Sequence, residues 1–180
     1  LGLKVGDRVK VQDLVYSMLI GSANDAAAAL GAYLEAVGDK PAQDLMNEQA
    51  KKLGMASTHY ENPIGFDSEQ NYSTAEDLKL LLMEAMEMEL FTSIDREQSY
   101  SFTSANGNQY YIKATNTLIN EDPEIRAIKT GFTDEAEGAM ITAIHSGNRQ
   151  FIMIILRSPN REQDTRILKS NILNTITMPQ

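Results

Sequence analysis

The periodicity of the sequence changes at about residue 99, and this change constrains the fold more than any other feature. Before it, apolar residues recur at helical spacing, for example in residues 11–20. After it, apolar and polar residues alternate on both sides of Asn106-Gly107, a dipeptide typical of the turn in a two-stranded hairpin. Helices followed by strands, rather than the two in alternation, predict an α+β fold.

The first part of the chain carries start and stop signals for helices. Gly21 ends the helix over residues 11–20, and Asn24 or Asp25 is a suitable N-cap for an alanine-rich helix that ends at Gly38. Pro41 at a helix start and Gly54 at its end predict a third helix. The capping box Ser73-Thr74-Ala75-Glu76 predicts the start of a fourth. Between these helices, residues 55–72 lack periodicity and are predicted to form an ordered loop.

The second part is predicted to form a sheet that a helix follows. Its strands are expected at residues 125–131, 139–145 and 150–157, and its closing helix at Arg161 to about Leu173. We therefore expect residues 1–98 to be mostly helical, and residues 99–180 to hold an antiparallel sheet and the C-terminal helix.

Composition argues against several kinds of site. The net charge of -9 argues against a nucleic-acid surface, which needs clustered Lys and Arg. The chain has no cysteine, and His59 and His145 are far apart in sequence, so we predict no metal site. No apolar run approaches the ~20 residues that a membrane helix requires. No signal peptide is present, and because Leu1 is not an initiator methionine we expect that an upstream piece has been removed.

Lys129-Thr130-Gly131 ends one of the predicted strands. The lysine supplies a cation, the threonine a hydroxyl donor, and the glycine a stretch of backbone that a substrate can approach closely. Together these groups can hold a carboxylate or an oxyanion beside a strand edge. The structural alternative is an exposed lysine before a turn glycine, since such a triplet occurs by chance in roughly a few per cent of chains of this length.

Two Ser-x-Asn triplets precede this strand. Ser22-Ala23-Asn24 lies between two predicted helices, where its side chains can be held rigidly. Ser104-Ala105-Asn106 runs into the hairpin turn, and we interpret it as turn chemistry. A Ser-x-Asn at a helix junction and a later Lys-Thr-Gly on a strand, together with Ser-x-x-Lys, are the signature of penicillin-binding proteins and class A β-lactamases.

The chain resembles the low-molecular-mass D-alanyl-D-alanine carboxypeptidases, serine peptidases that trim peptidoglycan stem peptides. The matching segments follow the order of that family across almost the whole chain: Gly2-Leu3-Lys4-Val5-Gly6-Asp7, Ser22-Ala23-Asn24-Asp25-Ala26-Ala27, Asn62-Pro63-Ile64-Gly65-Phe66-Asp67, Tyr72-Ser73-Thr74-Ala75-Glu76-Asp77-Leu78 and Lys129-Thr130-Gly131-Phe132-Thr133-Asp134-Glu135-Ala136. The resemblance implies a β-lactamase/transpeptidase-like fold, with residues 1–180 forming a single penicillin-binding catalytic domain that lacks its N-terminal part.

The resemblance also implies catalytic roles for three residues. Ser22 would relay protons near the nucleophile, and Asn24 would position the substrate amide and the catalytic lysine. Lys129 would keep the pocket positive and help to orient Ser22. Neither a metal nor an organic cofactor is implied.

Four further residues are implied to bind the substrate. Thr130 would bind the terminal carboxylate of D-alanine beside the open backbone of Gly131. The backbone N–H of Phe132 would supply half of an oxyanion hole. Arg161 would help to hold the substrate carboxylate, and the alternative for it is an arginine on the surface at a helix start.

Neither Ser-x-x-Lys nor Thr-x-x-Lys occurs in these residues, so the acylating serine and its activating lysine are missing. In the family this segment lies upstream of the Gly2-Leu3-Lys4 motif. We expect a truncated or clipped chain, or one fragment of a nicked enzyme whose companion carries Ser-x-x-Lys. A diverged and inactive homologue is the less favoured explanation, because the loss of the nucleophile helix would expose a large apolar face.

The expected activity of the full protein is removal of the terminal D-alanine from stem peptides that end in D-Ala-D-Ala, through an acyl-enzyme. β-Lactam antibiotics are the expected inhibitors, and the expected location is outside the cytoplasmic membrane. Two alternatives remain open: a peptidoglycan- or penicillin-binding homologue that does not cut, and a β-lactamase-like hydrolase.

Overall fold

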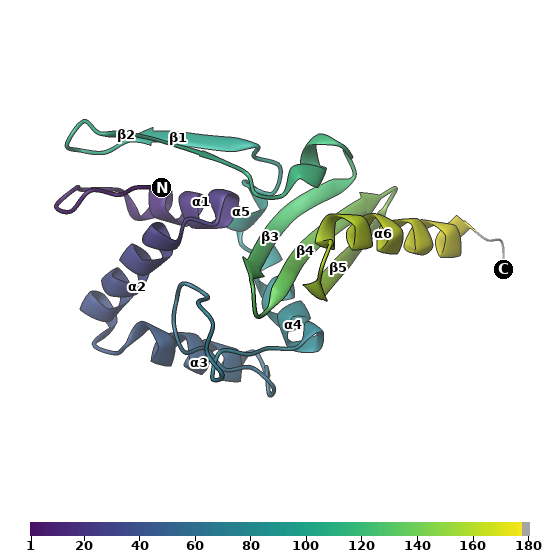
Figure 1. Cartoon of the computed structure of the whole chain (residues 1–180), viewed down its shortest axis with the longest axis horizontal. Helices are drawn as coiled ribbons and strands as arrows, with labels where there is room; N and C mark the ends of the chain where they lie inside the picture. The colour runs from purple at the N-terminus through teal and green to yellow at the C-terminus, as the bar shows by residue number, and fades with distance from the viewer. Residues whose placement is uncertain (178–180) are drawn as a thin grey trace. The chain divides into compact units, whose positions relative to one another are not determined.

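The structure is a computed structural model that describes residues 1–177, apart from the side chains of residues 127, 128, 176 and 177. The chain forms two compact units, Leu1–Thr115 and Asn116–Gln180 (Figure 1). The first unit combines helices with a two-stranded hairpin, and the second combines a three-stranded sheet with one long helix. Among the described residues, no helix is long and apolar enough to cross a membrane, and no group of three His, Asp or Glu side chains is arranged to hold a metal ion.

The helices predicted in the first unit are confirmed. Their bounds are α1 (Val11–Gly21), α2 (Asn24–Gly38), α3 (Ala42–Lys52) and α4 (Ala75–Met86). A short helix, α5 (Glu89–Thr92), has no periodic pattern that predicts it. The predicted hairpin is also confirmed, as β1 (Ser99–Thr103) and β2 (Gln109–Lys113) in antiparallel register. Because α1 contacts both strands, the hairpin belongs to the helical unit, and the change of periodicity at residue 99 is not the boundary between units.

Two apolar clusters form around α1. Leu14 packs with Ala23 and Ala26 where α1 meets α2. Ile20 packs with Ile94 and with Ile112 of β2. A Cβ at Gly21 would lie 3.0 Å from Cβ of Ile112, so the end of α1 and strand β2 are in close contact. The junction between α1 and α2 is therefore held by packed side chains of both clusters.

Two predicted N-caps are wrong by one or two residues. Ala23 occupies the N-cap position of α2, so neither Asn24 nor Asp25 caps that helix. The Asp25 carboxylate instead accepts hydrogen bonds from the N–H groups of Gly2 (2.7 Å) and Leu3 (2.9 Å). At α4, Thr74 is the N-cap, and its side chain accepts from the N–H of Asp77 in place of the predicted capping box.

Asp77 also orders the loop before α4. Its carboxylate accepts from the N–H of Ser57 and the hydroxyl of Thr58, both at 2.7 Å. His59 and Tyr72 then pair through their backbones in an isolated antiparallel bridge. These contacts confirm the prediction that residues 55–72 form an ordered loop.

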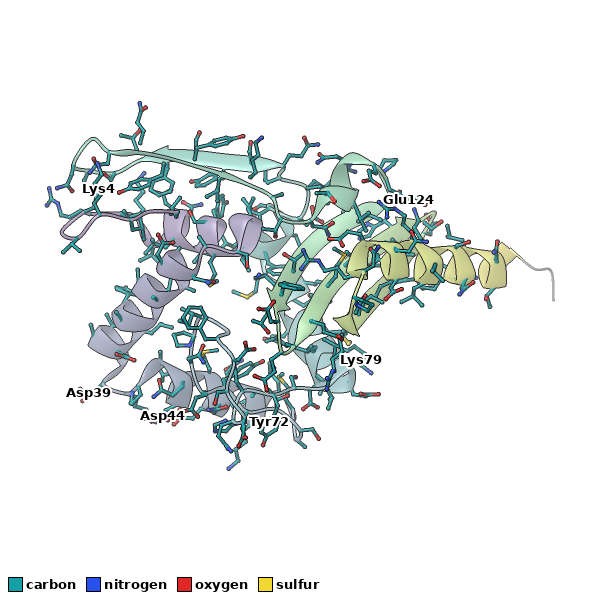
Figure 2. All side chains as sticks on the ribbon, viewed as in Figure 1. Lys4, Asp39, Asp44, Tyr72, Lys79 and Glu124 are labelled. Carbon is teal, nitrogen blue, oxygen red and sulfur yellow. The ribbon has the colours of Figure 1, made fainter. Side chains whose placement is uncertain are left out.

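The tip of the hairpin binds the N-terminal segment. Asn106 Oδ1 accepts from the N–H of Arg8 at 2.9 Å, and the carbonyl of Arg8 accepts from Ala105. The side chain of Lys4, labelled in Figure 2, donates to Asn108 Oδ1 at 2.7 Å. Within the tip, the carbonyl of Ser104 accepts from the N–H of Gly107, which agrees with the interpretation of this triplet as turn chemistry.

The second unit is an antiparallel sheet in the order β3-β4-β5, and a helix packs on one of its faces. The predicted strands and helix are confirmed with slightly longer bounds: β3 (Ile125–Thr133), β4 (Glu137–Ser146), β5 (Arg149–Ser158) and α6 (Arg161–Thr177), preceded by the 3-10 helix η1 (Thr117–Asn120). The hydroxyl of Thr165 on α6 donates to Met140 Sδ at 3.3 Å, so the helix lies over the face of the sheet that carries Met140. Ile144 and Met153 are buried on the same face.

A buried lysine fixes α6 to the segment that enters β3. Lys169 is 7% exposed and pairs with Asp122 and, at 2.7 Å, with Glu124. Figure 2 shows Glu124 beside α6. Burial alone would lower the pKa of Lys169, but its contacts with the two carboxylates raise that pKa.

Candidate active site

The Lys129-Thr130-Gly131 triplet lies on β3, which forms one edge of the described three-stranded sheet. The register between β3 and β4 shifts by one residue immediately before it. Ala127 lies opposite Thr142, whereas Lys129 lies opposite Ile141, so β3 carries one extra residue there. A bulge of this kind redirects the side chains that follow it, and bulges are common beside active sites.

Alternation along β3 separates the triplet onto two faces of the sheet. Thr130 is paired with Met140, which contacts α6, so the Thr130 side chain lies on the face that α6 covers. It is 5% exposed. Lys129 and Gly131 are directed to the opposite face, because neighbouring residues of a strand alternate.

Arg161, the first residue of α6, is bonded to the triplet. Its Nη1 donates to the carbonyl oxygen of Gly131 at 2.6 Å, and its Nε donates to Glu162 Oε1 at 2.9 Å. The Arg161 side chain is 19% exposed. Arg161 does stand at a helix start, as its structural alternative requires, and its guanidinium is anchored to β3.

Gly138 makes this position of Arg161 possible. A Cβ at residue 138 would lie 2.6 Å from the carbonyl oxygen of Ser158 and 3.4 Å from both Cβ and Cδ of Arg161. The backbone of β4, the end of β5 and the start of α6 can therefore approach one another only because residue 138 has no side chain. Neither Gly138 nor Glu162 stands out in the sequence, since their contacts appear only when the strands and α6 are packed.

Lys129 is a partly buried cation close to a second cation. Its Nζ donates to the carbonyl oxygen of Thr130. Burial, and secondly the charge of Arg161, lower the pKa of Lys129 from 10.5 to about 8. At neutral pH the amine is still mostly protonated, so this part of the unit holds two cations, of which Arg161 is paired with Glu162 and Lys129 adds a positive charge that suits an anionic group.

Beside Lys129, β3 is an edge strand of the described three-stranded sheet. A Cβ at Gly131 would meet only Cβ of Ala139, at an ordinary 3.8 Å, so packing within the described residues does not require a glycine at this position. The Phe132 side chain is 67% exposed. An edge strand presents a row of backbone groups that its own sheet does not pair, and another extended chain can pair with them.

Ser22 and Asn24 lie in the other unit, at the junction of α1 and α2. Ser22 is the C-cap of α1 and has left-handed backbone angles, φ 52° and ψ 38°, with its N–H donated to the carbonyl of Ser17. Asn24 is the first residue of α2 and is exposed. A left-handed conformation costs a residue other than glycine about 1–2 kcal/mol, and such strain is often found at functional sites.

The predicted site residues therefore fall into two groups, one in each unit of the chain. Lys129, Thr130, Gly131 and Arg161 come together in the second unit, and Phe132 follows them on β3. Ser22 and Asn24 stand in one turn of the first unit.

Comparison with known proteins gives these residues a context. The sequence profile of the D-alanyl-D-alanine carboxypeptidase family matches residues 1–160. The D-alanyl-D-alanine carboxypeptidase DacF of Bacillus subtilis is 26% identical over 168 residues, which are 93% of this chain and 43% of that protein. DacD of Escherichia coli is 31% identical over 172 residues, which are 92% of this chain and 42% of that protein.

Two solved structures are similar to this chain. The Streptomyces K15 DD-transpeptidase has a TM-score of 0.84 and 30% identity, with 92% of this chain and 68% of that chain covered. Penicillin-binding protein D2 from Listeria monocytogenes, in its ampicillin-bound form, has a TM-score of 0.76 and 32% identity, with 90% and 66% covered.

The mixed α+β fold is thus that of the penicillin-binding DD-peptidases. On the match over residues 1–160, the chain belongs to the D-alanyl-D-alanine carboxypeptidase family. It spans about two fifths of the length of the curated relatives named above.

Proposed function

We propose that the full-length protein containing this chain is a serine-type D-Ala-D-Ala carboxypeptidase that removes the terminal D-alanine of peptidoglycan stem peptides. The observation that carries the proposal is the hydrogen bond of 2.6 Å between Arg161 and the carbonyl of Gly131. It fixes a guanidinium beside the Lys-Thr-Gly strand of a chain that belongs to this family. A guanidinium and a hydroxyl on one face of this strand, with a lysine on the other, supply donors and positive charge that suit a substrate with a free carboxylate.

In this proposal, Thr130 and Arg161 bind the terminal carboxylate, and the penultimate carbonyl lies beside β3. The Phe132 N–H and the N–H of the nucleophile then stabilise the oxyanion that forms on that carbonyl. Gly131 leaves room for the peptide to approach the strand. Lys129 adds positive charge to this region, and Asn24 holds the amide of the substrate.

The reaction begins when a serine oxygen attacks the penultimate D-alanine carbonyl. The serine proton passes through Ser22 to the nitrogen of the terminal D-alanine, the C–N bond breaks, and free D-alanine leaves. Water then attacks the ester, which returns the serine and releases the shortened peptide. We assign the nucleophile and its activating lysine to a Ser-x-x-Lys segment of the full-length protein outside these 180 residues.

β-Lactams acylate the same serine in this proposal, and the protein acts outside the cytoplasmic membrane, where peptidoglycan is found. The β-lactam part is supported by the ampicillin-bound form of the Listeria relative. No metal or organic cofactor takes part in the proposed reaction.

The test uses denaturing intact-mass measurements on the full-length protein, with and without benzylpenicillin. A single penicilloyl adduct is expected, together with release of D-alanine from an acetylated peptide that ends in D-Ala-D-Ala. A peptide ending in L-Ala-L-Ala serves as the control substrate. A protein that forms no adduct and releases no D-alanine contradicts the proposal, and the non-cutting homologue would then replace it. Rapid hydrolysis of the adduct would instead favour a β-lactamase.

A transpeptidase is a second candidate, because one structural relative is described as a DD-transpeptidase. In that reaction an amine, in place of water, attacks the acyl-enzyme. Addition of an acceptor amine such as glycine to the peptide assay separates the two. A carboxypeptidase gives mainly the shortened peptide, whereas a transpeptidase gives mainly the amine adduct.

A further inference from the structure

Within the described part of the chain, Glu162 is the only carboxylate that contacts Arg161. Its Oε1 lies 2.9 Å from Arg161 Nε, and the Glu162 side chain is 28% exposed. An exposed ion pair between surface residues contributes little to the stability of a protein. This pair is different, because the arginine is anchored on its other side to the carbonyl of Gly131.

The two anchors determine which part of the guanidinium is left for a ligand. Arginine has five N–H donors in one plane. Nε uses its donor on Glu162, and Nη1 uses one of its two on Gly131, so three donors remain that have no partner among the described residues. Those three lie on Nη1 and Nη2, the pair that forms a bidentate contact with a carboxylate.

We propose that Glu162 is a positioning residue, which holds Arg161 so that its Nη1 and Nη2 face the terminal carboxylate of the substrate. This inference rests on the proposed carboxypeptidase function. It identifies the residue that gives the enzyme its preference for a substrate with a free carboxylate. Without the contact at Nε, the guanidinium can turn about its last side-chain bonds while Nη1 stays near Gly131. The carboxylate then loses its second hydrogen bond, although the positive charge remains.

Glu162 also has a purely structural explanation, and the chain supplies a control for it. A glutamate in the first turn of a helix interacts favourably with the helix dipole. Glu162 is the second residue of α6, and Glu76 is the second residue of α4, where it is exposed. Replacement of Glu76 therefore removes a dipole contact of the same kind without any change at Arg161.

The test compares Glu162→Gln, Glu162→Asp and Glu162→Ala with Glu76→Ala in the full-length protein. Glutamine keeps the oxygen that accepts from Nε but removes the charge. Aspartate keeps the charge and the favourable dipole contact but is too short to reach Nε. The measurement is kcat/KM for an acetylated peptide that ends in D-Ala-D-Ala and for the same peptide with a terminal carboxamide.

If Glu162 acts by position, Glu162→Asp and Glu162→Ala lose about ten- to a hundredfold in kcat/KM for the carboxylate peptide, mainly through KM. Their activity on the carboxamide stays as in the wild type. Glu162→Gln and Glu76→Ala keep the preference for the carboxylate. A melting curve for each variant excludes loss of fold as the cause.

Two results would overturn the inference in different ways. If Glu162→Asp behaves like the wild type and Glu162→Gln like Glu162→Ala, the charge matters and the position does not. If all variants at Glu162 keep the wild-type preference, Glu162 has no role in recognition. A wild-type protein that does not prefer the carboxylate peptide contradicts the proposed function itself, and the inference with it.

Discussion

Gly138→Ala is the sharpest test of the packing that holds Arg161. The new Cβ would lie 2.6 Å from the carbonyl oxygen of Ser158, a distance that real Cβ atoms do not adopt. That oxygen belongs to the backbone at the end of β5 and cannot rotate away as a side chain can, so β4 and β5 must move apart. Overpacking of this kind costs about 1–3 kcal/mol. In a protein of this size each kcal/mol lowers the melting temperature by roughly 2–4 °C.

Gly131→Ala is the matched control, because both glycines lie in paired strands of the same sheet. Its Cβ would meet only Cβ of Ala139, at 3.8 Å. We expect no loss of stability, or a gain of up to about 1 kcal/mol from the less flexible unfolded chain. Thermal unfolding followed by circular dichroism measures both variants. The packing argument is refuted if Gly138→Ala melts within about 1 °C of Gly131→Ala.

Three further predictions concern the site residues. Because burial and Arg161 lower the pKa of Lys129 to about 8, the unfolded state binds that proton more tightly than the folded state. The free energy of unfolding, taken relative to that of Lys129→Met, should then rise between about pH 8 and about pH 10.5, the ordinary pKa of a lysine side chain, by at most about 3 kcal/mol. Urea titrations measure this difference in unfolding free energy, and a difference that does not change with pH would contradict the prediction. Thr130→Val should weaken kcat/KM for the carboxylate peptide by about tenfold or more, on the scale of a hydrogen bond to a charged group, and an equal loss with the carboxamide would argue against carboxylate binding. The melting temperature of Ser22→Gly should equal or exceed that of Ser22→Ala, since glycine removes the cost of about 1–2 kcal/mol that the left-handed backbone imposes on other residues. Both variants should be acylated more slowly than the wild type if Ser22 relays the proton.

Apart from the short helices α5 and η1, the regular elements were predictable from the sequence because their signals are local. The hairpin follows from Asn106-Gly107 and the strands from alternation, and each lies where predicted. The N-caps were less predictable, since Ser73 and Thr74 are equally suitable residues side by side. Carboxylates near both helix starts are also engaged in tertiary contacts, Asp77 with the loop before α4 and Asp25 with the N-terminal segment.

The candidate site was predictable only in part, for the same physical reason. Lys129, Thr130 and Gly131 are adjacent in sequence and therefore form a recognisable motif. Arg161 follows 30 residues later, and its contact with Gly131 depends on how α6 packs on the sheet. The importance of Gly138 and Glu162 comes from that same packing, so no short pattern could have shown it.

The structure also gives a reason why three adjacent residues can serve three different tasks. Alternation places the side chain of Thr130 on the face covered by α6, and it directs Lys129 to the other face. Gly131 contributes its backbone, since its carbonyl accepts from Arg161 and nothing in the described packing needs a side chain there. A shift of β3 by one residue would exchange the two faces and send the lysine beneath α6. The bulge before Lys129 sets this register, so the chemistry of the triplet depends on a backbone irregularity as much as on its residue types.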